Sequence, residues 1–242
     1  MTSLTETNTT KLINQGETSS DQLSEYYKGN KLIALEAFKH NGILLQYASP
    51  ELRNDREVIL EGVNERGWTL RFASPELKND REIVLVAVKQ DGLSLEQASP
   101  KLKADREVVL VAVKQDGNAL EWASPELRND REVVLEAMNQ DVYLKCDTEE
   151  FGIPLKWASP ELKNDREIVL VAATKSIRAL EYASEEMQKY FKENGGVEGV
   201  LKIVKNEQSQ TYKTDENLFD RIRSVLDVFI KPENKSSSPK IK

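Results

Sequence analysis

The sequence predicts an all-α solenoid of six helical-pair units, each about 25 residues long, closed by a C-terminal helical cap. Three observations lead to this prediction. The string Asp-Arg-Glu, followed by Val or Ile, recurs along the middle of the chain. An apolar stretch of helical length follows each copy. Between the copies lies Ala-Ser-Pro, which is typical of a helix start, because Ser caps a helix and Pro fits its first position.

The copies of the Asp-Arg-Glu motif define the unit boundaries. They begin at Asp55, Asp80, Asp105, Asp130 and Asp165. The first three spacings are equal, and the last is longer because the fifth unit contains an insertion, 142–151. A degenerate copy, Asn30-Lys31-Leu32-Ile33, precedes the first full motif by the same regular spacing. The units therefore start at 30, 55, 80, 105, 130 and 165, and the last ends at 189.

Unit 105–129 shows how each element is expected to form. Asp105 is a good N-cap, because its carboxylate can accept hydrogen bonds from the amides of the first helical turn. Residues 108–113 form the apolar helix, and we expect Gly117 to end it in a left-handed conformation. A second short helix is expected over 120–123, and Ser124-Pro125-Glu126 then predicts a new helix start.

The apolar stretch also has a competing interpretation as a buried β-strand, because Val-Val-Leu-Val-Ala-Val is rich in β-branched residues. A strand followed by a helix within a unit of this length would indicate a leucine-rich repeat, but that repeat's leucine and asparagine pattern is absent. The Asp and Gly positions bracket about three helical turns, a normal helix length. A helix that is apolar on nearly all sides is expected between two neighbours in a stack, so helix is favoured.

The segments around the repeats differ in composition. Residues 1–20 are rich in Thr, Ser and Asn and are expected to be disordered, and the helical array is expected over 21–189. A helical cap is expected over 190–230, because a solenoid needs an atypical end unit to cover its last apolar face. Helices are predicted over 185–193, 197–205 and 215–230, with a break at Gly195-Gly196. The Ser-, Lys- and Pro-rich segment 231–242 is expected to be a flexible basic tail.

Composition excludes several classes of function. The chain has 242 residues, a net charge of −7, one Cys and one His. These counts leave no internal disulfide and no Cys/His metal cluster, and we expect no cofactor. The repeats carry a net charge of −7 while 231–242 carries +3, so binding of nucleic acid by the repeats is not expected. No apolar run is long enough to span a membrane, and the first ten residues, which have no basic and no apolar region, do not predict a classical signal peptide. We expect a cytoplasmic protein, with export by a route that needs no signal peptide left open.

The strings Asp105-Arg106-Glu107-Val108-Val109-Leu110 and Ala123-Ser124-Pro125-Glu126-Leu127 resemble a known tandem-repeat family that is catalogued only as a domain of unknown function. The resemblance covers all six units, 30–189, and implies no catalytic residue and no ligand. It does imply a setting, because the family occurs in bacteria that live inside host cells, often in injected effectors. The first unit departs from the pattern by lacking Asp-Arg-Glu, and the last by lacking its Gly and Pro, as expected of end units.

One column of the repeat is the strongest candidate for partner binding. Near the end of the second helix, five of the six units carry an aromatic residue, and the third carries Gln97. The aromatic residues are Tyr47, Phe72, Trp122, Trp157 and Tyr182. We expect this aromatic column to form a partly exposed ridge that binds a protein. The alternative is packing between neighbouring units.

Two further features have both a functional and a structural interpretation. The recurring arginines of the motif could bind an anion, but their flanking acids favour helix capping by Asp and pairing of Arg with an acid of a neighbouring unit. The insertion 142–151 could carry binding residues, with Tyr143 and Glu149 as candidates, or could be a neutral loop. A Cys146–His40 dyad is not expected, because the two residues lie several units apart.

These observations together predict a binding scaffold rather than an enzyme. The predicted partner is a protein, in the setting of a bacterial effector acting on a host protein, and the oligomeric state stays open. The alternative is an enzyme whose site uses acidic residues of the insertion or the C-terminal segment, and a pocket of carboxylates with shifted pKa values would favour it.

Overall fold

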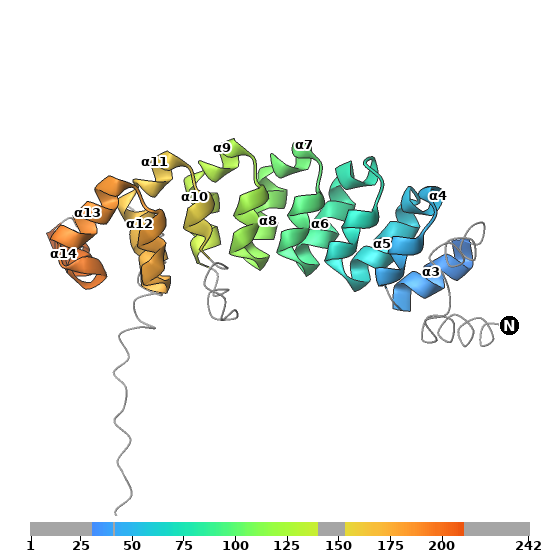
Figure 1. Cartoon of the computed structure of the whole chain (residues 1–242), viewed down its shortest axis with the longest axis horizontal. Coiled ribbons are helices and arrows are strands. Elements are labelled where there is room, and N and C mark those ends of the chain that lie inside the picture. The colour runs from blue at the N-terminus through green and yellow to red at the C-terminus, as the bar shows by residue number, and fades with distance from the viewer. Residues whose placement is uncertain (1–30, 41, 140–152, 211–242) are drawn as a thin grey trace, which may run out of the picture.

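The computed structural model describes residues 31–40, 42–139 and 153–210, and these form a stack of helices along a gentle arc (Figure 1). The predicted all-α repeat architecture is confirmed. No strand occurs within those three ranges, so the strand alternative is wrong. None of the helices found there is long and apolar enough to cross a membrane.

Each unit contains three helical segments, one more than the predicted pair. The long helices are α3 (Lys31–His40), α5 (Arg56–Glu65), α6 (Arg81–Gln90), α8 (Arg106–Gln115), α10 (Arg131–Met138) and α12 (Arg166–Lys175). They are followed by the 3-10 helices η1 (Gly42–Tyr47), η2 (Gly67–Phe72), η4 (Gly92–Gln97), η5 (Gly117–Trp122), η7 (Pro154–Trp157) and η8 (Ile177–Tyr182). One-turn helices complete five units: α4 (Pro50–Arg53), η3 (Leu77–Asn79), α7 (Pro100–Lys103), α9 (Pro125–Arg128) and α11 (Pro160–Lys163).

The segments form two layers. Consecutive long helices pack against one another, and so do consecutive 3-10 helices. The one-turn helices lie along the outer edge of the arc, where α4, α7, α9 and α11 are labelled (Figure 1). Each position of the repeat therefore recurs at the same place in every unit, and equivalent residues of successive units form a row on the surface.

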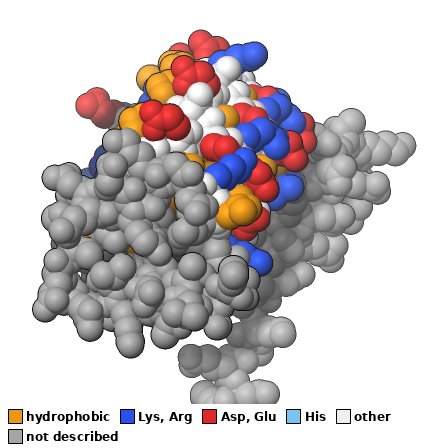
Figure 2. Space-filling model, turned by 90° about the vertical axis from the view of Figure 1, so that its right-hand side faces the viewer, with side chains coloured by type: hydrophobic (Ala, Val, Ile, Leu, Met, Phe, Trp, Pro, Cys, Tyr) orange, Lys and Arg blue, Asp and Glu red, His pale blue; other side chains and the backbone are white. Residues whose placement is uncertain are grey.

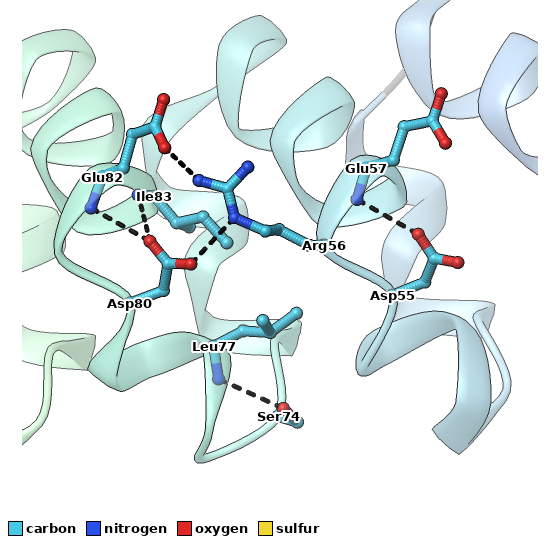
Figure 3. Close-up of polar contacts among 8 residues, drawn as sticks. All are labelled: Asp55, Arg56, Glu57, Ser74, Leu77, Asp80, Glu82 and Ile83. Atoms are coloured by element: carbon cyan, nitrogen blue, oxygen red, sulfur yellow. Dashed lines mark hydrogen bonds and ion pairs between the residues drawn. The ribbon is translucent and has the colours of Figure 1, made fainter.

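The predicted helix starts are confirmed. The Asp105 carboxylate accepts hydrogen bonds from the amides of Glu107 and Val108 at 3.0 and 3.2 Å. The Ser124 hydroxyl accepts from the amide of Leu127 at 3.4 Å, with Pro at the first helical position. These bonds satisfy amides that a helix cannot pair internally. The same two caps are drawn for the preceding units in Figure 3.

The predicted role of Gly117 is wrong. The glycine does not have a positive φ; it begins η5, and α8 ends before it at an extended Asp116. A Cβ at this position would lie 2.3 Å from the carbonyl oxygen of Ala137, in the long helix of the next unit. The glycine is thus required by close packing between units rather than by a turn.

The long helices bury residues on both sides, as expected for helices between two neighbours. In α8, the side chains of Val108, Val109, Ala112 and Val113 are fully buried. They form one continuous core with the buried Leu120 of the 3-10 layer. The mixture of β-branched residues in this helix therefore reflects burial on two sides, not strand formation.

The C-terminal end is built differently. The sixth unit continues into α13 (Glu185–Glu193), and α14 (Gly196–Gln210) packs against α12 and α13. Gly195 and Gly196 have φ values of 81° and 70°, so the predicted break is confirmed and requires glycine. The predicted helix over 197–205 lies within α14. The expectations for 1–20, 215–230 and 231–242 fall outside the described residues and stay predictions.

Candidate functional site

A row of ion pairs connects successive long helices. The Arg56 guanidinium donates from Nε to Asp80 Oδ2 at 2.9 Å and from Nη2 to the carboxylate of Glu82 (Figure 3). Asp80 and Glu82 belong to the first turn of the next unit, and Asp80 is also its N-cap. One arginine therefore binds both the cap and the first turn of its neighbour.

The same geometry recurs in the other units. Arg81 pairs with Asp105 and Glu107, Arg106 with Asp130 and Glu132, and Arg131 with Asp165 and Glu167. In the degenerate first unit, Lys31 replaces the arginine, and its Nζ lies 2.8 Å from both Asp55 and Glu57. Figure 2 shows basic and acidic side chains alternating along one side of the stack. The structural interpretation of the motif, a cap plus a pair with the next unit, is confirmed.

We call this row of ion pairs the ion-pair ladder, and the pKa shifts of its members arise from the hydrogen bonds within it. Partial burial alone would raise the pKa of Asp80, but the hydrogen bonds from Arg56 and from the Ile83 amide outweigh it, so the pKa is lowered. Asp55, Asp105 and Asp130 follow the same pattern. Hydrogen bonds to Asp80 and Glu82 raise the pKa of Arg56. Each ladder cation is shared between two carboxylates, which leaves little field for an external anion.

The aromatic column lies in the 3-10 layer, and its members are half-buried. All five, Tyr47, Phe72, Trp122, Trp157 and Tyr182, pack against the core with part of the side chain exposed. Lys103 Nζ lies 5.4 Å from the centre of the Trp122 ring, and Lys156 Nζ lies 4.9 Å from that of Trp157. These distances allow cation–π attraction. The column thus contributes to packing and also presents ring surface beside cations.

Two apolar residues of the 3-10 layer, Trp68 and Leu93, were not among the candidates predicted from the sequence. The Trp68 ring packs edge-on against Phe72, with centroids 6.0 Å apart, and Leu93 is 38% exposed. Both occupy the second position of a 3-10 helix. Because this helix has three residues per turn, that position lies on the outer face. The three-residue spacing between Gly67 and the buried Leu70 is typical of a 3-10 helix and could have predicted this outer position.

A second basic column, also missed, borders the aromatic column. It consists of Lys78, Lys103, Arg128 and Lys163, which we call the basic strip. All four are half-buried; Lys78 is the middle residue of η3, and the other three are the last residues of α7, α9 and α11. None of them forms an ion pair with a carboxylate of the described residues. Burial lowers the pKa of Lys78, and the charge of nearby Arg71 lowers it further. Burial and Arg128 do the same to Lys163.

The remaining candidates lie outside the structure's described residues. These are Tyr143, Glu149 and Cys146 of the insertion; for His40, the last residue of α3, only the backbone is described. Within the part of the chain that is described, no group of three His, Cys, Asp or Glu side chains is arranged to hold a metal ion.

Comparison with known proteins identifies the repeat. The family described as "Domain of unknown function (DUF4116)" matches residues 30–69, 55–103, 105–146 and 149–188, which together make up well over half of the chain. No curated protein and no solved structure matches the chain. The matched ranges coincide with the repeat array and leave the C-terminal helix α14 outside. This chain is therefore a member of the DUF4116 family.

Proposed function

We propose that this protein is a scaffold that binds a partner protein across several consecutive units through the 3-10 layer. The observation that supports this most strongly is the aromatic column, because half-buried Trp and Tyr side chains combine rigid support with exposed ring surface. The residue just before each aromatic one varies in charge, from Arg71 to Glu121 and Lys156. Such variation on a constant framework is how a repeat protein can encode partner specificity.

The rigidity of the framework supports the proposal as well. Besides the ion-pair ladder, the hydroxyl of Ser99 donates to Asn79 Oδ1 at 2.7 Å, and its amide donates to the Lys78 carbonyl at 2.9 Å. Equivalent backbone bonds join the other units. A binding surface whose side chains are already held in place loses less conformational entropy when a partner binds.

We propose binding rather than catalysis for the described residues. A general acid needs a raised pKa, whereas the resolved pKa shifts of carboxylates here are downward and arise from helix caps and ladder partners. The proposed setting, a bacterial effector inside a host cell, rests on the resemblance of the units alone. A translocation reporter fused to the full chain, compared between infected cells with and without a functional secretion system, would test that setting.

The binding proposal is tested by site-specific photocrosslinking. A photoreactive amino acid at position 122 or 157 of the full chain should crosslink one partner from a host-cell lysate, identified by mass spectrometry. The matched control is position 114, an exposed lysine at the end of α8 in the other layer. Trp122→Ala with Trp157→Ala should abolish capture while circular dichroism stays unchanged. Equal crosslinking from position 114, or capture that survives the double substitution, would refute the proposal.

A further inference from the structure

The basic strip differs from every cation of the ion-pair ladder. Each ladder arginine is bound by two carboxylates, whereas Lys78, Lys103, Arg128 and Lys163 have no carboxylate partner among residues 31–40, 42–139 and 153–210. At the two ends of the same column, the polar side chain instead donates hydrogen bonds to backbone carbonyls of its own unit. Arg53 donates to the carbonyls of Gln46 and Ala48, and Gln188 occupies the corresponding place in the sixth unit. Only the four middle members remain available to an external anion.

Three members of the strip, Lys103, Arg128 and Lys163, adjoin a following unit that carries an aromatic residue in the column, whereas Lys78 adjoins the unit of Gln97. The Lys103 ammonium group is over the Trp122 ring, and the Ser124 amide donates to the Lys103 carbonyl at 2.9 Å. The same backbone bond joins Ser159 to Arg128 at 3.0 Å and Ser184 to Lys163 at 2.9 Å. It brings Arg128 next to the unit of Trp157, and Lys163 next to the unit of Tyr182. One edge of the stack thus carries four cations without carboxylate partners among the described residues, and three of them adjoin a unit with an aromatic residue in the column.

We propose that this edge binds an acidic peptide segment in the polyproline II conformation, with a carboxylate at every third residue. The proposal rests on the scaffold function above and names its partner. Neighbouring helices pack about 8–10 Å apart, so one cation recurs at about that interval. A polyproline II helix rises about 3.1 Å per residue with three residues per turn, which is about 9.3 Å per turn. One peptide turn therefore matches one repeat unit, and aromatic side chains are the usual surface for such peptides.

The charges around the strip favour a peptide over a nucleic acid. Glu126 and Glu161 are exposed on α9 and α11, and the exposed Glu76 directly precedes η3; each lies two residues before the cation of its unit, where the third unit has Lys101 instead. A continuous phosphate backbone would bring charge against these carboxylates as well as against the cations. A peptide can place uncharged residues opposite the glutamates and a carboxylate only opposite each cation. The strip is thus a local positive feature in an array whose net charge is −7.

Fluorescence anisotropy with the full chain and labelled probes tests this inference. The probes are an Asp-Pro-Pro repeat peptide of about fifteen residues, which makes about five turns, its Lys-Pro-Pro and Ala-Pro-Pro counterparts, and a single-stranded oligothymidine. We expect the acidic peptide to bind most tightly, with affinity that falls as salt is added. Lys103→Gln with Arg128→Gln should weaken binding on the order of tenfold. Lys89→Gln with Lys114→Gln, an equal change of charge on the long helices, should have no effect.

The outcomes separate this inference from the scaffold proposal. Equal binding of the acidic, neutral and basic peptides, or an equal loss in the control variant, would overturn the inference. Tighter binding of oligothymidine would also overturn it and would indicate a nucleic-acid surface. In each case, crosslinking from positions 122 and 157 would still decide whether the scaffold proposal holds. Circular dichroism of every variant shows whether a loss of binding reflects unfolding.

Discussion

An interior unit and the last unit have nearly the same backbone but different residues at their junction. In unit 80–104, Gly92 begins η4 after Asp91, whose φ is −149°. In unit 165–189, Ile177 begins η8 after Ser176, whose φ is −146°, and Ile177 is 62% exposed. A Cβ at Gly92 would lie 2.4 Å from the Ala112 carbonyl oxygen of the next unit. The comparison shows that this glycine is required by the neighbouring unit rather than by its own fold.

The largest effect is expected from Gly92→Val. The added side chain collides with the backbone of the next long helix, which cannot move without disturbing the core, so we expect a loss of about 3 kcal/mol in the free energy of unfolding. Urea unfolding followed by circular dichroism measures the change. A free energy of unfolding equal to that of the wild type would contradict the conclusion that the neighbouring unit requires this glycine.

Acid should weaken the ion-pair ladder, because its aspartates pair with a neighbouring unit only while they are charged. The pKa values of Asp55, Asp80, Asp105 and Asp130 are lowered in the folded protein, so their stabilising contribution is present above the ordinary value of 3.8 and is lost as pH falls below it. The urea midpoint measured from pH 6 downward should therefore stay level and fall below about pH 4. A midpoint that rises in this range would contradict the assignment.

The two roles of a ladder aspartate can be separated at Asp105. Asp105→Ala removes both the cap and the pair with Arg81, and a loss of about 1–2 kcal/mol is expected. Asp105→Asn keeps a capping oxygen and removes only the charge, so it should cost less. Chemical unfolding of both variants at neutral pH gives the difference between cap and pair. An equal loss in the two variants would mean that the cap contributes nothing.

A natural irregularity between two interior units allows a gain of stability. Serines 74, 99, 159 and 184 donate to an Asn of the preceding unit, but Ser124 faces Ala104 instead. Ala104→Asn should restore this hydrogen bond and stabilise the protein by about 0.5–1 kcal/mol. Thermal unfolding would detect the rise in Tm. Ser124→Ala in the same background should remove the gain, and its persistence would contradict this explanation.

The smallest effect is expected at the terminal position itself. Ile177→Gly removes an exposed side chain that no following unit contacts, so the free energy of unfolding should change by less than about 0.5 kcal/mol. The value is to be compared with Gly92→Val under identical urea conditions. Similar losses in both variants would mean that the two junctions do not differ as proposed.

The repeat sequence predicted the features that depend on neighbours along the chain. Asp105 and Ser124 cap helices as expected, because an N-cap bonds only amides two or three residues away. The glycine break at 195–196 was likewise predictable. The partner of Arg56 could be placed in the next unit, because the fixed period puts the same motif beside itself in the stack.

Other features could not be predicted, because they depend on distances across the stack. The role assigned to Gly117 was wrong for this reason, since nothing in its own unit indicates a carbonyl 2.3 Å from its missing Cβ. The partial exposure of Trp122 was expected, but the 3-10 geometry of η5 that positions it was not. The basic strip was missed because a lysine such as Lys103 at a helix end already has an ordinary explanation in the helix dipole.

The all-α class, the six units, the helix caps and the ladder were predictable from the sequence, because they follow from local capping and from a motif that recurs at a constant period. The second basic column could be judged only from the tertiary structure, which leaves it without carboxylate partners among the described residues. Arg56 and Lys78 are both basic residues that recur once per unit, but one faces two carboxylates of the next helix and the other faces none among the described residues. Charge in a sequence is a property of a residue, whereas its neutralisation depends on what the fold places within a few ångströms.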